Sequence, residues 1–97
     1  MEKGQFNDAF ATAERGISID SSDALLWNLM AQIRLKQDNY MQAEQLAKKS
    51  NLLTKDRSLQ AKNWRIISEA LRGKGAASES KKALFKALEL ETERAGG

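Results

Sequence analysis

The side chains that most often carry catalysis are missing or isolated in this sequence. It holds no histidine and no cysteine, so the commonest general base, the commonest transition-metal ligand and the thiolate nucleophile are absent. Ser78 and Ser80 therefore have no imidazole partner to activate a hydroxyl. Glu89, Glu91 and Glu93 are spaced carboxylates, but they stand near the exposed end of a predicted helix. We expect no catalytic residue, no metal site and no cofactor.

A glycine-rich stretch, Gly73-Lys74-Gly75, has the composition of a phosphate-binding loop. Such a loop follows a β-strand and opens a helix, so that backbone N–H groups surround the phosphate. This stretch instead follows a helical pattern, and two close glycines end a helix at little steric cost. We interpret it as a turn. The chain is therefore predicted not to be an enzyme, and its function must come from surfaces that its helices hold in place.

The composition is that of one small soluble domain. Of the 97 residues, 41% are hydrophobic and 30% are charged, and the net charge is +3. No apolar run approaches the roughly 20 residues needed to span a bilayer. The charge is uneven, because residues 1–46 sum to −3 and residues 47–97 sum to +6. A solvated helical surface explains this pattern, and so does a basic end that docks an acidic partner or a nucleic acid.

An internal repeat is the main signal for the fold. Six positions recur 34 residues later with the same size class or turn role, except that Asp38 follows Gly4, and both of these suit a turn. A period of this length predicts stacked helical hairpins, which expose long surfaces for partners. The positions are Gly4, Phe6, Ala9, Ala13, Gly16 and Ile19, followed by Asp38, Tyr40, Ala43, Ala47, Ser50 and Leu53.

A second register places the two tryptophans in the same local setting. Trp27 and Trp64 lie 37 residues apart, and the three extra residues fit a longer connection at 54–58. We interpret both indoles as core residues, each anchoring one hairpin. The matched positions are Ala24, Trp27, Met30, Ala31, Ala43, Ala47, Ser50 and Leu53, then Ala61, Trp64, Ile67, Ser68, Ser80, Leu84, Ala87 and Leu90.

Apolar residues at helical spacing predict five helices. They lie at about residues 5–17, 23–36, 40–53, 57–72 and 76–92, with a frayed tail at 95–97. We expect residues 1–94 to form a single domain, in which the second helix of a truncated repeat (5–19) precedes repeats at 24–53 and 61–92. Thr54 or Asp56 is expected to cap the fourth helix. The last helix is expected to bury Leu84, Ala87, Leu88 and Leu90.

These residues resemble the tetratricopeptide repeat (TPR) family. Trp27-x-x-Met30-Ala31 and Trp64-x-x-Ile67-Ser68 are similar to its first helix, which has a bulky residue, then a hydrophobic one and a small one. Its turn and second helix resemble Tyr40, Ala43 and Ser50, then Gly75, Ser80, Leu84 and Ala87, and also Gly4, Phe6, Ala9 and Gly16 near the start. The resemblance implies an all-α, right-handed stack of antiparallel helical hairpins, a TPR-like α-solenoid of about five helices.

The sequence departs from the TPR pattern at two informative positions. Asp38 stands where the family usually has glycine. Arg34 stands where the family prefers an aromatic residue or leucine, so we expect Leu35 to pack in its place. Neither departure changes the hairpin assignment.

The resemblance implies a non-enzymatic scaffold that binds a peptide or protein on a concave face. The first helix of each hairpin lines that face, here 23–36 and 57–72. Amides can bond an extended peptide backbone, and cations can pair with acidic groups. The implied groove residues are Leu25, Asn28, Gln32, Leu35, Lys36, Lys62, Arg65, Glu69 and Arg72. The carboxylate clamp of some chaperone-binding members is not expected, because Leu29 and Ile66 stand where that clamp has polar or basic groups.

The first predicted helix has no preceding partner, since Met1-Glu2-Lys3 is too short to form one. We therefore expect a piece of a longer chain, with an exposed apolar patch at Phe6, Phe10 and Ala13 that supports a homodimer. The stretch QAEQLAKKSNLL is similar to repeat segments of Gram-negative envelope lipoproteins. This similarity suggests a bacterial chain of the cytoplasm or periplasm.

Nucleic-acid or acidic-partner binding through the basic C-terminal half is the alternative function. The cations are Lys48, Lys49, Lys55, Arg57 and Lys62, then Lys81, Lys82 and Lys86. Single-stranded nucleic acids favour sites with exposed aromatic rings, and Trp27 and Trp64 are predicted to be buried. Nucleic acid is therefore the less favoured partner.

Overall fold

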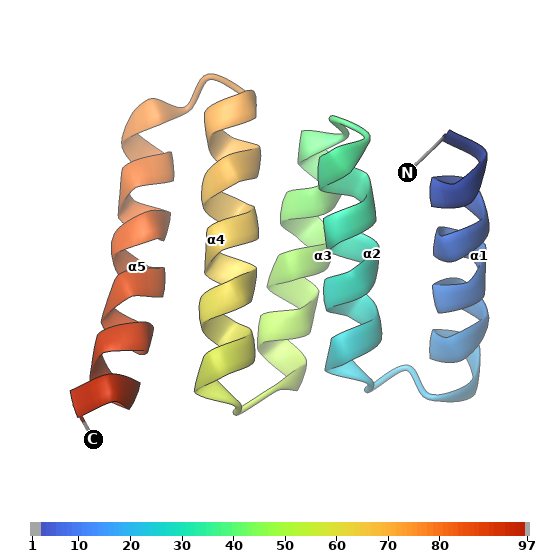
Figure 1. Ribbon diagram of the computed structural model, residues 1–97, viewed down its shortest axis with the longest axis horizontal. Coiled ribbons are helices and arrows are strands. Elements are labelled where there is room, and N and C mark those ends of the chain that lie inside the picture. The colour runs from blue at the N-terminus through green and yellow to red at the C-terminus, as the bar shows by residue number, and fades with distance from the viewer. Residues whose placement is uncertain (1–2, 97) are drawn as a thin grey trace.

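The computed structural model describes the backbone of residues 3–96 and the side chains of residues 3–92, and over this range every regular element is a helix. The helices are α1 (Lys3–Ile19), α2 (Ala24–Lys36), α3 (Tyr40–Leu53), α4 (Arg57–Gly73) and α5 (Ala77–Gly96). Figure 1 shows that each runs opposite to the one before it. The predicted all-α stack of antiparallel hairpins is thus confirmed. The longest extension is at α5, which continues beyond Thr92 to Gly96, while Met1, Glu2 and Gly97 lie outside the described residues.

Polar side chains at the turns define where the helices begin. Asp23 caps α2, because its carboxylate accepts from the backbone N–H groups of Leu25 and Leu26. Asp56 caps α4 in the same way, accepting from the N–H of Ser58 at 2.8 Å. Of the two residues proposed as caps for this helix, Asp56 is therefore the one used.

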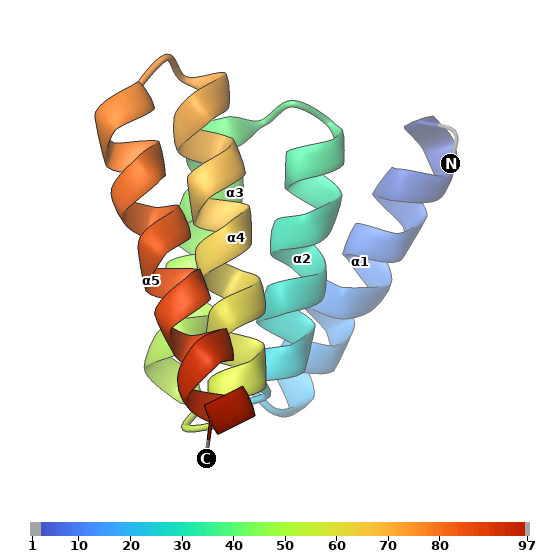
Figure 2. The same cartoon turned by 60° about the vertical axis from the view of Figure 1, so that its left-hand side comes forward.

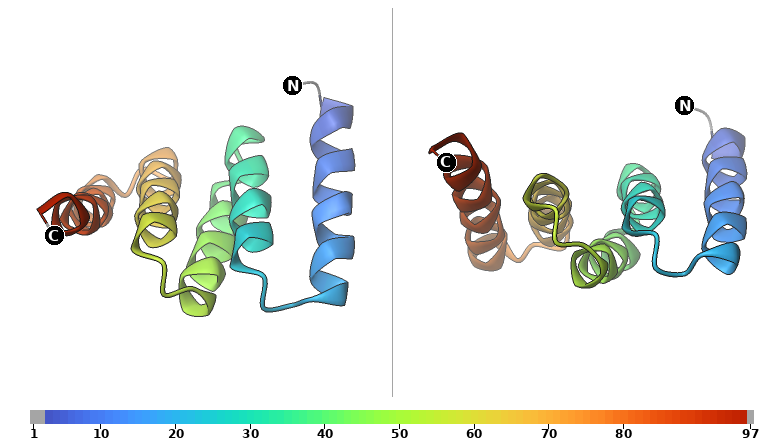
Figure 3. Two further views of the ribbon diagram at one scale, coloured as in Figure 1. Left: turned by 60° about the horizontal axis from the view of Figure 1, so that its bottom comes forward. Right: turned by 90° about the horizontal axis from the view of Figure 1, so that it is seen from below.

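The helices pack as two hairpins with α1 against the first. The α2–α3 and α4–α5 pairs form the hairpins, and α3 packs against α4. The backbones of α2 and α4 also approach each other closely, whereas those of α3 and α5 do not within the described range. Figure 2 shows α4 and α5 side by side, and Figure 3 shows α3 displaced to one side of α2 and α4. The molecule therefore has one face built on α2 and α4 and an opposite face on which α3 forms a ridge.

Small residues at the helix crossings allow this close packing. Ala31, Ala43 and Ala47 have no exposed surface, as the repeat predicts, and Ile67 fills the space between the hairpins. Gly16 has the same role between α1 and α2. A Cβ atom there would lie 2.6 Å from a methyl group of Leu26, so a larger residue would require the Leu26 side chain to move.

Helix α5 is rotated relative to the prediction. Leu84 and Leu88 are exposed, so the expectation that they face inward is wrong, whereas Ala87 and Leu90 are buried as predicted. Ala83 is buried in place of Leu84. The reason is steric, because small residues on the inner side let α5 approach α4 closely. The larger leucines then stand on the side of α5 that no described helix covers.

Candidate partner-binding surfaces

The α2/α4 face is the outer surface of helices α2 and α4, and it carries most of the predicted groove residues. Its α2 stripe is partly apolar, since Leu25 is 67% exposed and Leu29 is 41% exposed. Its α4 stripe is charged. The exposed predicted residues on the two stripes are Leu25, Gln32, Lys36, Lys62, Arg65, Glu69 and Arg72. Because α2 and α4 are in direct contact, the face sets an apolar strip beside a charged one.

Asn28 does not line this face, and the prediction that it does is wrong. Its side chain is buried, because Nδ2 donates to Oδ1 of Asn63 at 2.7 Å and Oδ1 accepts from Nε2 of Gln32. Asn63 donates in turn to Oγ of Ser50 at 2.8 Å and to Oδ1 of Asn51 at 2.9 Å. Asn63 thus has both amide hydrogens and its carbonyl oxygen paired. This network ties α2, α3 and α4 together behind the face.

Arg65 is exposed but already paired. Its Nε and Nη2 atoms donate to the two carboxylate oxygens of Glu91 at 2.8 and 2.7 Å, joining α4 to α5. These hydrogen bonds raise the pKa of Arg65 and lower the pKa of Glu91. A ligand carboxylate must compete with Glu91 for this guanidinium. Lys62 and Arg72 are better candidates, because neither has an ion-pair partner among the described side chains.

Two adjoining cavities extend the charged stripe. One, of about 240 Å³, lies beside Leu35, and the other, of about 340 Å³, lies beside Arg65. Glu69 and Arg72 line both of them. Four predicted groove residues therefore surround one pair of neighbouring hollows at the same end of α4.

The predicted self-association patch is largely covered. Ala13 is buried, so the expectation that it is exposed is wrong, and Phe6 and Phe10 are half-buried. The guanidinium of Arg34 in α2 lies 3.5 Å from the centroid of the Phe10 ring in α1, so a cation–π contact links the two helices. Leu35 packs against the core in place of Arg34, as predicted. Homodimer formation through this end stays a prediction, which sedimentation at high protein concentration tests.

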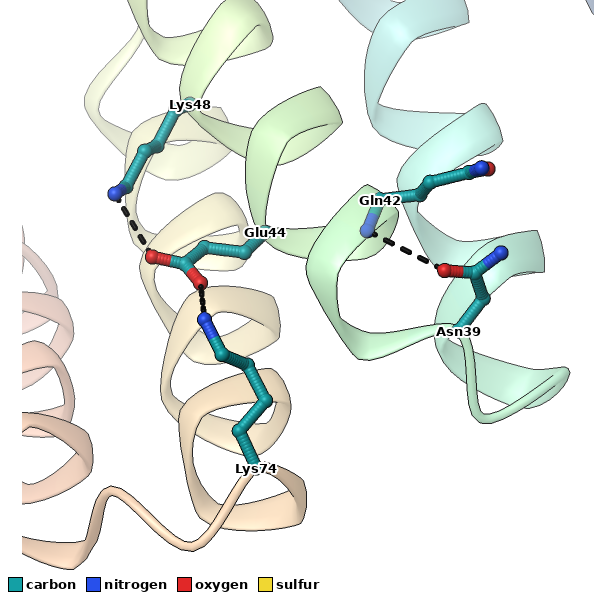
Figure 4. Close-up of polar contacts among 5 residues, drawn as sticks. All are labelled: Asn39, Gln42, Glu44, Lys48 and Lys74. Carbon is teal, nitrogen blue, oxygen red and sulfur yellow. Dashed lines mark hydrogen bonds and ion pairs between the residues drawn. The ribbon is translucent and has the colours of Figure 1, made fainter.

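The basic residues of the C-terminal half do not gather on one surface. Lys48 is paired with Glu44 at 2.8 Å, as Figure 4 shows. Lys62 of α4 lines a cavity beside α5, whereas Lys48, Lys82 and Lys86 line a different cavity between α3 and α5. A nucleic-acid strand lying along the α2/α4 face would not reach the second group.

The groups considered for chemistry have structural contacts. Ser80 is buried, its hydroxyl donates to the carbonyl of Ser68 at 2.8 Å, and the Ser68 hydroxyl donates to the carbonyl of Ser80 at 2.9 Å. Gly75, in the glycine-rich stretch, forms the turn after α4. No group of acidic side chains suited to holding a metal ion occurs within the described part of the chain. The side chain of Glu93 lies outside that part.

Comparison with known proteins gives no family for this chain. No protein-family model matches it, and no curated protein is significantly similar to it. Among the described helices, none is both long enough and apolar enough to cross a bilayer. The function must therefore be argued from the geometry of the surfaces.

Proposed function

We propose that this chain is a TPR-like helical scaffold that binds a peptide or protein partner on its α2/α4 face. The observation that carries the proposal is the exposed pair Leu25 and Leu29 of α2, one helical turn apart, on the face that also carries Lys62 and Arg72 of α4, which have no ion pair among the described side chains. Apolar side chains grouped within a polar rim are typical of protein-binding surfaces. The fold supports this role, because stacked hairpins present such faces over a long distance.

The chemistry of the face indicates which partner fits it. Leu25 and Leu29 suit an apolar side chain of the partner, and Lys62 and Arg72 suit its carboxylates. Gln32 has a free amide oxygen near the α2 stripe, which can accept from a peptide N–H group. A segment that combines acidic and apolar residues satisfies both strips at once.

The buried network behind the face favours binding by keeping the surface in shape. Asn28 and Asn63 fix the distance between α2 and α4 through a 2.7 Å hydrogen bond that water does not reach. A surface that is already ordered loses less conformational entropy on binding. The groove residues on both helices are therefore presented in one arrangement before a partner arrives.

A peptide display library tests this proposal. Peptides are selected on the whole chain and then measured against Leu25→Ser/Leu29→Ser and against the matched control Met41→Ser/Leu52→Ser, which removes exposed apolar side chains from α3. We expect the first variant to lose affinity by about tenfold or more, because two apolar contacts are removed, and the control to bind as the wild type does. Equal binding to both variants would place the binding surface elsewhere.

A titration with single-stranded oligonucleotide tests the alternative function. The one observation that favours it is the net charge of +6 over residues 47–97. Binding that depends on phosphate contacts is strongest at low salt. If no oligonucleotide binds at low ionic strength, nucleic acid is excluded as the partner.

A further inference from the structure

The face opposite to α2 and α4 carries two grooves, one on each side of the α3 ridge. The first, of about 370 Å³, lies between α3 and α5 with Trp64 of α4 in its floor. The second, of about 360 Å³, lies between α1 and α3 and has Trp27 of α2 in its floor. Both indoles are half-buried, so part of each is accessible from its groove. We call these the Trp64 groove and the Trp27 groove.

The two grooves are copies of one feature of the repeat. Each residue that lines the Trp27 groove has its repeat equivalent in the lining of the Trp64 groove. Phe10 corresponds to Glu44 at the offset of 34, and the others correspond at the offset of 37. The pairing shows that an aromatic floor with a lysine on its rim, Lys49 in one groove and Lys86 in the other, is built into the hairpin itself.

The substitutions between the copies add charge of both signs, and two of them, Phe10 to Glu44 and Gln42 to Glu79, add carboxylates to the Trp64 groove. Gln45 becomes Lys82, which adds a cation to the rim of the Trp64 groove, and Leu46 becomes the smaller Ala83. In the Trp27 groove, the ammonium of Lys49 lies 5.7 Å from the indole centroid, a cation–π contact. The Trp64 groove has no such contact among the described residues, so Lys86 is not engaged with its indole.

The charges around the Trp64 groove leave two ammonium groups without a carboxylate. Glu44 is occupied by Lys48 and Lys74 (Figure 4), at 2.8 and 2.9 Å. Lys82 and Lys86 have no ion pair among the described side chains. They flank an apolar floor of Trp64, Ile67, Leu71 and Ala83. The groove therefore combines an apolar cavity with two unpaired ammonium groups on its α5 side, where Glu79 is the only carboxylate among the lining residues.

We propose that the Trp64 groove is a second binding site, which accepts an acidic peptide segment with one large apolar side chain. The apolar side chain enters over Trp64, and neighbouring carboxylates pair with Lys82 and Lys86. The Trp27 groove does not bind this segment, because Gln45 stands there in place of Lys82 and Lys49 is engaged with Trp27. This site is separate from the α2/α4 face and does not depend on the function proposed for that face.

The observations favour a peptide over the other anionic partner, a nucleic acid. Glu44 and Glu79 stand on the same rim and would repel a continuous chain of phosphates. A peptide can place its few carboxylates beside Lys82 and Lys86, which follow Glu79 by about one and two turns along α5. Its apolar side chain also gains from the floor, which a phosphate backbone cannot use.

The two tryptophans provide a test that reads each groove separately. The chain holds only these two, so its indole N–H groups give two NMR signals, which Trp27→Phe and Trp64→Phe assign. The probe is a short end-capped peptide with one central phenylalanine flanked by aspartates. We expect the Trp64 signal to shift on titration up to about millimolar peptide, while the Trp27 signal stays in place. A peptide with lysines in place of the aspartates, or alanine in place of phenylalanine, is expected to bind at least about fivefold more weakly.

Two variants with the same net charge distinguish binding in the Trp64 groove from a general attraction between the acidic peptide and a positively charged protein. Lys82→Gln/Lys86→Gln is expected to weaken binding by about fivefold or more, whereas Lys3→Gln/Lys55→Gln, with the same net charge and outside both proposed sites, leaves it unchanged. The proposal is overturned if the Trp64 signal does not move, if both indole signals move together, or if the two variants lose affinity equally. It is also overturned if a single-stranded oligonucleotide shifts Trp64 at lower concentration than the peptide, or if protein concentration alone shifts it, which would indicate a second copy.

Discussion

Asp38 and Gly75 occupy the same place in successive hairpins, and both have a left-handed backbone, with φ of 58° and 86°. Glycine adopts this conformation freely, whereas a residue with a side chain loses roughly 1 kcal/mol. In the first hairpin, the hydroxyl of Tyr40 donates to the Asp38 carboxylate at 3.1 Å, which offsets part of this cost and raises the pKa of Tyr40. The turn geometry is thus set by the hairpin and not by the presence of glycine.

Substitutions at the two turns should therefore differ in effect. We expect Gly75→Ala to lower the free energy of unfolding by about 1 kcal/mol, because an alanine at positive φ is strained although its Cβ would meet no atom within 4 Å. Asp38→Gly should change it by less than about 0.5 kcal/mol, since relief of strain offsets the lost hydrogen bond and the more flexible unfolded chain. Urea unfolding measures both, and an unchanged midpoint for Gly75→Ala would contradict the turn assignment.

A second prediction concerns the crossing of α4 and α5. Two serines meet there, whereas two alanines meet at the equivalent crossing in the first hairpin. Ser68 and Ser80 bond to each other at positions where Ala31 and Ala43 pack in the α2–α3 hairpin. Each single change, Ser68→Ala or Ser80→Ala, should cost about 1 kcal/mol by leaving a buried hydroxyl with fewer partners. The double substitution should cost less than the sum, and a double-mutant cycle with strictly additive values would show that the hydroxyls are not coupled.

The repeat predicted the helices because two helices can cross closely only where their residues are small, and such residues therefore recur at a fixed spacing. Ala43 and Ala47 are buried as that argument requires. Spacing was less informative for α5, where apolar residues occur around much of the helix. Ala83 and Leu84 are adjacent, and periodicity alone does not decide which of them faces α4.

The burial of polar residues in the core is a second feature that the sequence pattern did not predict, for a different reason. Asn28 and Asn63 stand next to exposed positions in their helices, and a polar side chain is ordinarily expected to face water. Their burial depends on partners from three helices, 12 to 35 positions apart in the sequence. No local pattern contains that information. The grooves beside the tryptophans were missed likewise, because both indoles were assigned wholly to the core.

The buried network predicts a graded response to substitution. Asn63→Ala should lower the free energy of unfolding by about 2–3 kcal/mol, because it leaves the buried amide N–H of Asn28 without its acceptor and removes one of the two partners of the Ser50 hydroxyl. Asn51→Ala should cost about 1 kcal/mol, since Asn51 is half-buried and water can replace it. Urea unfolding of both variants tests this order. Equal losses for the two would mean that burial of the network has no energetic effect.

Glu44 couples the stability of the α3–α4 contact to pH. Its side chain is 12% exposed and accepts hydrogen bonds from Lys48 and Lys74 at 2.8 and 2.9 Å. Burial raises the pKa of Glu44, but the two lysine hydrogen bonds and charges outweigh it, so the pKa lies below the ordinary value of 4.5. The folded protein therefore binds this proton less tightly than the unfolded chain. The resulting stability is present above about pH 4.5 and is lost as pH falls through the lower folded value.

Removing this charge should have an effect that depends on pH. At about pH 7, Glu44→Gln should lower the free energy of unfolding by about 1 kcal/mol, because both lysines lose their carboxylate. At about pH 3, the difference from the wild type should shrink, because much of the advantage of the ionised Glu44 is then lost. Glu14→Gln is the control, since Glu14 is exposed on α1, has no ion pair among the described side chains and should show no such loss. Urea unfolding at both pH values measures the free energy of unfolding of each variant. If the difference between Glu44→Gln and the wild type is the same at both pH values, the two lysines do not lower the pKa of Glu44.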